Sequence, residues 1–187
     1  MNTLHEGPQD EAAIQMTARL VPGDAAAPTE KAAWAVRARS ALAPVGTLGL
    51  RAWLAQEFIL AGWTKWQGGL TPPEWFAQLP FPGPLSWLPA QANWLSVMGL
   101  ELLLGMALLL GAFTRWAAAG LMFITAVAIW TVHADLGWSG WNQIETEMGQ
   151  GFKVPLMMMV MLTALIGQGG GRFSLDGAWR SWREATS

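Results

Sequence analysis

The sequence contains no cysteine. Without thiols, the chain cannot form disulfides, use a thiolate nucleophile or hold a metal cluster through cysteine. Tyrosine is also absent, although the 187 residues include 13 tryptophans. Charged residues make up only 13% of the chain, compared with about 25% in an ordinary soluble domain. The net charge of −2 does not bear on nucleic-acid binding, but the lack of a basic patch or zinc-ligand spacing removes nucleic acid as an expected partner.

Hydrophobic residues make up 52% of the chain, and most of them fall in four long stretches. The stretches run over about residues 45–66, 92–112, 116–134 and 152–168. Roughly 20 apolar residues span the hydrocarbon core of a bilayer. Helices of a soluble bundle carry polar stripes at helical spacing, and stretches such as "LLLGMALLLGAF" have none. We therefore predict an all-α integral membrane four-helix bundle, with short helical pieces in the proline-rich outer loop between the first two spans.

The rest of the chain divides into segments of different composition. Residues 1–30 are rich in alanine, proline and acids, and we expect a cytoplasmic tail that is disordered or wrapped on a partner. The opening residues lack the apolar core of a cleavable secretion signal. Residues 31–44 are expected to lie on the membrane surface, residues 45–178 to form the membrane domain, and residues 179–187 to form a second cytoplasmic tail.

Basic residues accumulate on the cytoplasmic side of short loops, so their distribution predicts orientation. Two lysines, Lys65 and Lys153, fall on one side of the predicted spans. The basic residues on the other side are Arg19, Lys31, Arg37, Arg39, Arg115, Arg172, Arg180 and Arg183. This asymmetry predicts that both termini are cytoplasmic, as expected for a multi-pass protein of a bacterial inner membrane.

Three charged residues lie away from the ends of the predicted spans. Glu57 and Glu101 fall near the middle of neighbouring antiparallel helices, and Arg51 precedes Glu57 by six residues. Charges at this depth are costly and usually face the bundle interior, where they find partners. One interpretation is a proton-handling site in which Glu57 and Glu101 share a proton. The alternative is a structural ion pair between Arg51 and one of the two carboxylates.

Polar and aromatic residues also gather at the predicted outer end of the spans. Lys65 and His133 lie there with Trp63, Trp66 and Trp130. Tryptophans at this level ordinarily form an interfacial belt, and a histidine at a helix end is commonly just an interfacial residue. The functional alternative is a cavity for a quinone or lipid head, with His133 exchanging a proton with it.

Three segments of the chain resemble a known family. They are "LRAWLAQEFILAGWTKW", "ELLLGMALLLGAFTRWAAAGLMF" and the glycine-rich "GQGGGRFSLDGAW". Over about residues 46–178 the chain resembles the DoxX-like membrane proteins, which are related to the DoxD subunit of thiosulfate:quinone oxidoreductase. The resemblance implies a four-helix membrane bundle associated with redox systems that feed electrons to quinone. The matching positions are Arg51, Lys65, Glu101 and Arg115.

Two functions follow from these observations. The first is a membrane subunit of a quinone-linked redox system, with quinone as the expected cofactor, since no haem, flavin or metal motif is visible. The second is a non-catalytic accessory subunit of a larger respiratory or photosynthetic membrane complex, because the N-terminal tail and the tryptophan-rich outer loops resemble docking surfaces. Either function implies the lipid bilayer and other membrane subunits as partners. A small-solute or proton transporter is a weaker third alternative, because the sequence shows no inverted repeat.

Overall fold

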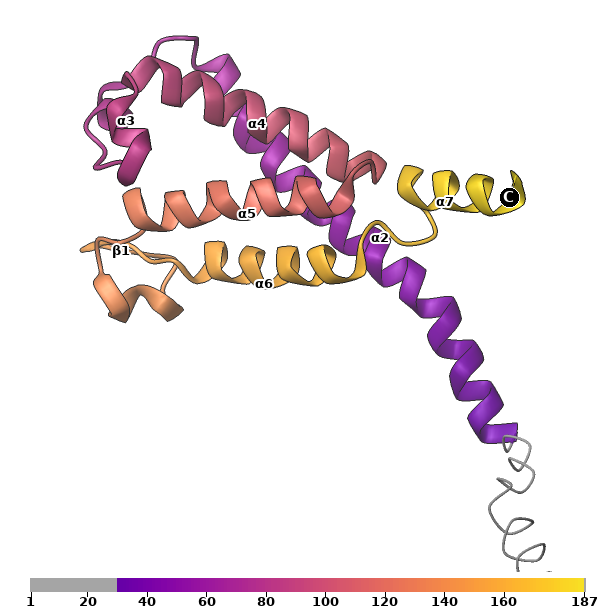
Figure 1. The fold of residues 1–187 in the computed structure, drawn as a ribbon. Helices are drawn as coiled ribbons and strands as arrows, with labels where there is room; N and C mark the ends of the chain where they lie inside the picture. Colours follow the sequence, from indigo (N-terminus) through magenta and orange to yellow (C-terminus); the bar gives the residue numbers. More distant parts are fainter. Residues whose placement is uncertain (1–29, 187) are drawn as a thin grey trace, which may run out of the picture. The chain divides into compact units, whose positions relative to one another are not determined.

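The computed structural model describes residues 30–186 (Figure 1). The tail predicted for residues 1–30 therefore lies almost entirely outside the described residues. The chain divides into two units, one ending at Arg39 and the other beginning at Ser40. Every site discussed below lies in the second unit.

Long helices account for most of the described residues. They are α2 (Glu30–Gln67), α4 (Ala90–Leu110), α5 (Thr114–Thr131) and α6 (Lys153–Gln168), followed by α7 (Leu175–Thr186). The last three of the four apolar stretches match α4, α5 and α6 to within three residues at each end. Among the described residues, α4 and α5 are each long and apolar enough to cross a membrane, and α6 is a shorter apolar helix. The predicted helical, membrane-type composition is thus confirmed.

Two segments differ from the expected boundaries. The surface segment expected over residues 31–44 is the first part of α2, which continues through Pro44. Proline removes one backbone N–H from a helix interior. The sequence on either side of Pro44 is nevertheless rich in alanine and other helix-compatible residues. In the same turn the Thr47 hydroxyl donates to the Ala43 carbonyl at 3.0 Å. The tail expected from residue 179 is also helical, because α7 extends to Thr186.

The connections contain short elements, which the proline-rich composition predicts for the one between α2 and α4. Between α2 and α4 lie the single turn α3 (Glu74–Ala77) and the 3₁₀ helix η1 (Gly83–Trp87). Between α5 and α6 lie the 3₁₀ helix η2 (Gly137–Asn142) and a small antiparallel hairpin. The hairpin strands are β1 (Glu145–Thr146) and β2 (Gly149–Gln150).

One apolar core joins the four long helices. Figure 1 shows α5 running beside α6, and α5 also contacts α4. The buried core residues are Leu54, Ala55 and Phe58 of α2, Leu108 of α4, Ala117, Ala118, Leu121 and Ile124 of α5, and Leu162 and Leu165 of α6. Most other large apolar side chains point away from this core and are exposed.

Two glycines set the register between α2 and α4. A Cβ placed on Gly62 would lie 2.8 Å from a Leu102 side-chain carbon, and a Cβ on Gly105 would lie 2.9 Å from an Ile59 side-chain carbon. The helix backbones approach closely at these points, as small residues allow in membrane proteins. This register determines which charged residues meet across the helix pair.

Candidate functional site

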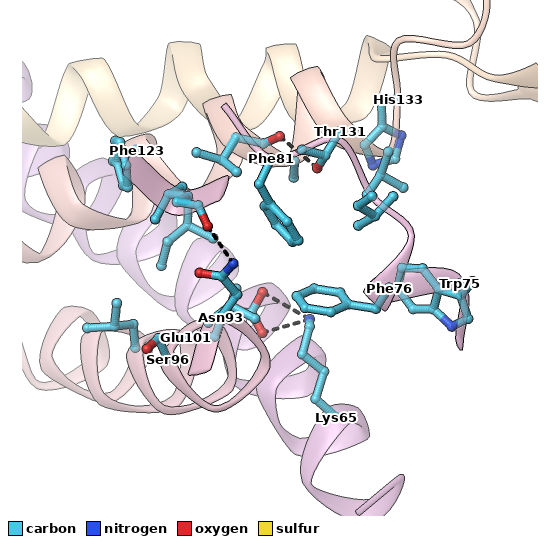
Figure 2. Close-up of a pocket in the computed structure, with 18 residues that line it drawn as sticks. Lys65, Trp75, Phe76, Phe81, Asn93, Ser96, Glu101, Phe123, Thr131 and His133 are labelled. Atoms are coloured by element: carbon cyan, nitrogen blue, oxygen red, sulfur yellow. Dashed lines mark hydrogen bonds and ion pairs between the residues drawn. The ribbon is translucent and has the colours of Figure 1, made fainter. Parts of the chain in front are cut away.

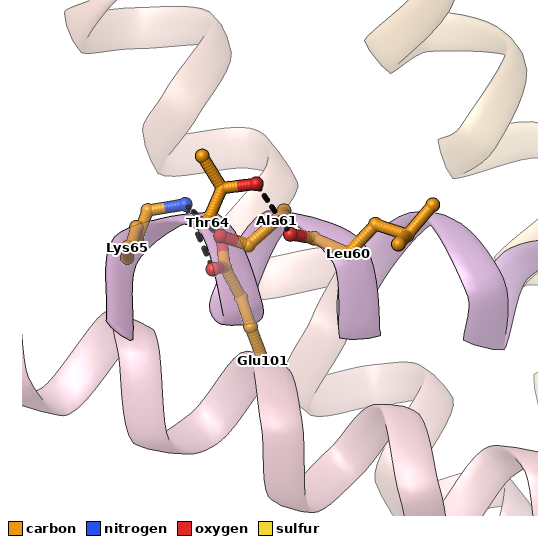
Figure 3. Close-up of polar contacts among 5 residues, drawn as sticks. All are labelled: Leu60, Ala61, Thr64, Lys65 and Glu101. Carbon is orange, nitrogen blue, oxygen red and sulfur yellow. Dashed lines mark hydrogen bonds and ion pairs between the residues drawn. The ribbon is translucent and has the colours of Figure 1, made fainter. Parts of the chain in front are cut away.

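The charged pair between α2 and α4 consists of Lys65 and Glu101. The Lys65 Nζ lies 2.8 Å from Glu101 Oε2 and 3.0 Å from Glu101 Oε1 (Figure 3). Both side chains are largely buried, with 21% of Lys65 and 8% of Glu101 exposed. Each carboxylate oxygen therefore accepts a hydrogen bond from the ammonium, and the negative charge of Glu101 is compensated inside the bundle.

Glu57 takes no part in this pair, contrary to the expected sharing of a proton with Glu101. It lies eight residues before Lys65 on α2, or about 12 Å along the axis at 1.5 Å per residue. The Glu57 side chain is half-buried. Within residues 30–186 no hydrogen bond or ion pair is found for its carboxylate.

Arg51 also has different partners from those expected. It is 1% exposed, and its guanidinium donates to four backbone carbonyls rather than to a carboxylate. Nε and Nη2 bind the Leu108 and Leu109 carbonyls at 2.9 and 2.8 Å. Nη1 binds the Gly170 and Phe173 carbonyls at 2.9 and 2.7 Å. Arg51 thus binds carbonyls of the last turn of α4, of which Leu108 also accepts the Gly111 N–H at 3.1 Å, and joins them to the glycine-rich segment after α6.

Asp176 binds backbone N–H groups at the start of α5. Its carboxylate oxygens accept the backbone N–H groups of Phe113 and Thr114, both at 2.8 Å, so Asp176 caps the N-terminus of α5. Partial burial on its own would raise the pKa of the Asp176 carboxyl. The hydrogen bonds from Thr114 and Phe113 and the nearby Arg51 charge outweigh burial and hold that pKa below its ordinary value.

The α4–α5 turn is therefore held from both sides, by a cation on the carbonyl end of α4 and an anion on the amide end of α5. Gly111 occupies this turn with φ of 69°, a left-handed conformation suited to glycine. The Gly111 carbonyl accepts the backbone N–H of Asp176 at 3.0 Å. Asp176 was not identified from the sequence as a structural residue, although it lies in the segment "GQGGGRFSLDGAW" that carries the family resemblance.

A cavity of about 340 Å³ lies beside the Lys65–Glu101 pair, enclosed by the end of α2, the α3–η1 loop, α4 and α5 (Figure 2). Its lining residues are Lys65, Trp75, Phe76, Leu79, Phe81, Leu85, Asn93, Ser96, Val97, Leu100, Glu101, Phe123, Ile124, Val127, Ala128, Thr131, Val132 and His133. Most of them are apolar, so the buried ion pair sits at the wall of a hydrophobic chamber.

The structure brings some of the predicted cavity residues together and leaves others out. Lys65 of α2 and His133, which follows the end of α5 by two residues, both line the cavity. Trp63, Trp66 and Trp130 do not line it, and they are 50%, 53% and 64% exposed. These three point outward from their helices, as residues of an interfacial belt do. The aromatic lining comes instead from Trp75, Phe76, Phe81 and Phe123.

Aromatic packing holds α3 and the loop after α2 in place beside the cavity. Phe76 of α3 is 6% exposed and stacks edge-on against Trp94, with ring centroids 4.9 Å apart. Trp94 is 4% exposed, and its indole N–H donates to the Gly69 carbonyl at 3.0 Å. This contact ties the loop after α2 to the first turns of α4. These contacts therefore fix the position of α3 and of this loop relative to the ion pair.

Polar groups on the cavity wall come from α4 and from the end of α5. Asn93 is 6% exposed, and its Nδ2 donates to the Leu85 carbonyl at 2.9 Å. The His133 Nδ1 lies 3.1 Å from the Gly151 carbonyl. A carbonyl only accepts, so this nitrogen carries a proton. Asn93 was missed in the sequence because a lone amide near the end of an apolar stretch has no motif around it.

Two lining residues reach the outer surface of the helices. Leu100 of α4 is 42% exposed, and Phe123 of α5 is 60% exposed. These side chains border the cavity and also face away from the core. The described residues contain no group of three or more His, Asp or Glu side chains placed to hold a metal ion.

Comparisons with known proteins place the chain among its relatives. The sequence model of the DoxX family matches residues 46–134, the part that contains α4, α5 and the Lys65–Glu101 pair. An uncharacterized protein of Haemophilus influenzae is 40% identical over 134 residues, which cover 71% of this chain and 82% of that protein. No solved structure matches the chain. The resemblance seen in the motifs is confirmed, and the chain belongs to the DoxX family of membrane proteins.

Proposed function

We propose that this DoxX protein is the membrane subunit of a quinone-linked redox system and that its cavity binds the head of a lipid-soluble quinone. In this proposal α2, α4, α5 and α6 all cross the bilayer, and both termini lie in the cytoplasm, in agreement with the distribution of basic residues. The cavity then lies toward the outer leaflet of a bacterial inner membrane.

The observation that carries the proposal is the combination of an apolar chamber and a buried ion pair. A quinone head is a flat ring with polar atoms at two ends, and ligand sites of this kind are mostly apolar with a few placed polar groups. Aromatic and aliphatic side chains supply the ring contacts, and the Lys65 ammonium can donate to an oxygen of the ring. A volume of about 340 Å³ is at the lower end of the size of small-molecule sites, sufficient for a head without its tail.

A lipid tail also needs a way out of the chamber. Leu100 and Phe123 line the cavity and are exposed on the faces of α4 and α5. If these faces contact lipid, the head enters the cavity sideways from the bilayer while the tail stays among the acyl chains. Glu101 then exchanges protons with the head through Lys65, and electrons pass to or from a partner subunit or substrate.

The test is binding of a short-chain quinone, decyl-benzoquinone, to purified protein in lipid nanodiscs, followed by quenching of tryptophan fluorescence. Ala128 lines the cavity and Ala126 does not, although both lie on α5. We expect Ala128→Phe to weaken binding about tenfold by filling the chamber, and Ala126→Phe to leave it unchanged. Equal binding by both variants, or no binding by the wild type, would contradict the proposal.

The second candidate is an accessory subunit of a larger respiratory or photosynthetic complex. It is favoured by the large apolar side chains that the connecting segments expose: Trp87, Trp138 and Met148 are 83%, 89% and 85% exposed. Such side chains are typical of surfaces that bind other proteins. Purification in mild detergent separates the two: a stoichiometric complex favours this role, and quinone without partners favours the first.

A further inference from the structure

The hydrogen-bonding capacity of the cavity wall is unequally divided between donors and acceptors. Each neutral polar group on the wall that comes from a buried or half-buried residue already uses a proton on a backbone carbonyl, and of these groups only the Asn93 amide has a second N–H. Asn93 Nδ2 donates to Leu85 at 2.9 Å, the Thr131 hydroxyl donates to Val127 at 2.9 Å, and His133 Nδ1 lies 3.1 Å from the Gly151 carbonyl.

Apart from the second N–H of the Asn93 amide, the unused positions on these three residues are acceptors. Only the nitrogen of the Asn93 amide can donate to a carbonyl, so its orientation is determined and its Oδ1 is left over. No group of residues 30–186 donates to this oxygen, although the side chain is 6% exposed. The Thr131 oxygen retains a lone pair. In a neutral His133 with the proton on Nδ1, Nε2 is an acceptor.

The charged groups on the wall do not reverse this balance. Figure 2 shows the Lys65 ammonium directed to both oxygens of Glu101, at 2.8 and 3.0 Å, so most of its donor capacity is spent. The Glu101 carboxylate is itself an acceptor. Two exposed lining residues add donors: the Trp75 indole N–H, for which no hydrogen-bond partner is found within residues 30–186, and the rotatable Ser96 hydroxyl, which can donate or accept. The chamber therefore presents more acceptors than donors to whatever fills it.

We propose that the cavity selects a ring ligand that donates hydrogen bonds, a hydroquinone or related phenol, over the corresponding quinone. The inference deepens the proposed quinone site and depends on it. A hydroquinone carries two O–H donors, whereas a quinone has only carbonyl acceptors. A quinone head can accept the second N–H of the Asn93 amide but leaves the acceptors of Asn93, Thr131 and His133 unpaired, whereas each hydroxyl of a hydroquinone can both donate and accept.

Asn93 and Thr131 are then residues that determine specificity. Asn93 is held in place by its bond to Leu85, and Thr131 by its bond to its own helix, so both acceptors are positioned before the ligand arrives. Two hydrogen bonds of ordinary strength predict that the reduced ligand binds at least about tenfold more tightly than a form of the same shape that cannot donate.

The test compares three probes with the same decyl tail on wild-type protein in nanodiscs under anaerobic conditions: decyl-benzoquinol, decyl-benzoquinone and the dimethyl ether of the quinol. The ether keeps the ring and cannot donate. We expect the quinol to bind at least about tenfold more tightly than either of the others. Asn93→Leu and the isosteric Thr131→Val should each reduce this ratio at least about threefold, and the exposed Asn142→Leu should not change it.

Thr131→Val keeps the test decisive if loss of the Leu85 contact prevents Asn93→Leu from folding. Equal affinity for the three probes, tighter binding of the quinone, or an unchanged ratio in the folded variants would overturn the inference and leave the quinone site standing. Failure of all three probes to bind would overturn the proposed function, and the inference with it.

Discussion

Replacing both members of the Lys65–Glu101 pair is expected to separate folding from ligand binding. Lys65→Met leaves the Glu101 carboxylate, which is 8% exposed, without its cation. Breaking a buried pair in this way costs about 3–5 kcal/mol of the free energy of unfolding. Glu101→Leu leaves an ammonium on a long, flexible side chain at the end of α2, which can turn toward the surface, so we expect a smaller loss of about 1–3 kcal/mol.

The double variant Lys65→Met with Glu101→Leu removes both charges and restores an apolar contact between α2 and α4. Buried pairs replaced by apolar residues of similar size are often neutral in stability, so we expect this variant within about 1 kcal/mol of the wild type. The coupling free energy between the two positions is then at least about 3 kcal/mol. The double variant should fold but bind decyl-benzoquinol at least about tenfold more weakly, because the polar anchor of the cavity is missing.

The assay is unfolding in mixed detergent micelles with increasing SDS, followed by far-UV circular dichroism. The binding measurement uses the same protein in nanodiscs. Glu101→Gln is a useful intermediate, because it keeps an acceptor for Lys65 and loses the titratable proton. Additive losses in the two single variants would refute the ion pair as described, and wild-type binding by the folded double variant would remove the pair from the ligand site.

Four other predictions concern the helix ends, the register of α2 against α4 and the orientation of the chain in the membrane. Arg51→Met should lower the free energy of unfolding by about 2–6 kcal/mol, counting about 1–3 for each of the Leu109 and Gly170 carbonyls, which lose their donor, whereas Arg115→Met, with one exposed bond to a carbonyl, should lose less than about 1 kcal/mol in the same SDS titration. Because folding lowers the pKa of Asp176, its contribution to stability is complete above the ordinary value of about 4 and is lost as the pH falls through the lowered pKa; Asp176→Asn should flatten the acid side of a pH–stability curve measured by circular dichroism. Gly62→Ile should destabilise α2 against α4 by about 1–3 kcal/mol and weaken quinol binding, because an added Cβ there already lies 2.8 Å from a neighbouring side chain, whereas Gly49→Ile, with nothing within 4 Å, should do neither. Reporter fusions at both termini should be active only in the cytoplasm, and periplasmic activity of either one would contradict the proposed orientation.

Much of the helical framework could be predicted from the sequence because it depends on local composition. A helix closes its backbone hydrogen bonds within its own segment, so an uninterrupted apolar stretch with flanking polar residues is sufficient to indicate it. The predicted ends at 152 and 168 agree closely with those of α6. The continuation of α2 through Pro44 was not predicted, because proline favours a break and only the surrounding turn shows that the helix continues.

The sequence by itself determined which charged residues are costly where they stand, and the tertiary structure decided which of them have partners and what those partners are. Arg51, Glu57 and Glu101 could be identified as costly in an apolar segment without any structure. Their pairing depends on the register of α2 against α4, and the close contacts at Gly62 and Gly105 place Lys65 beside Glu101. Likewise, the acceptors at Asn93 and His133 face one cavity only because α3 and η1 fold over the ends of α4 and α5. Periodicity along one helix carries no information about such contacts, because they join residues that are distant in the chain.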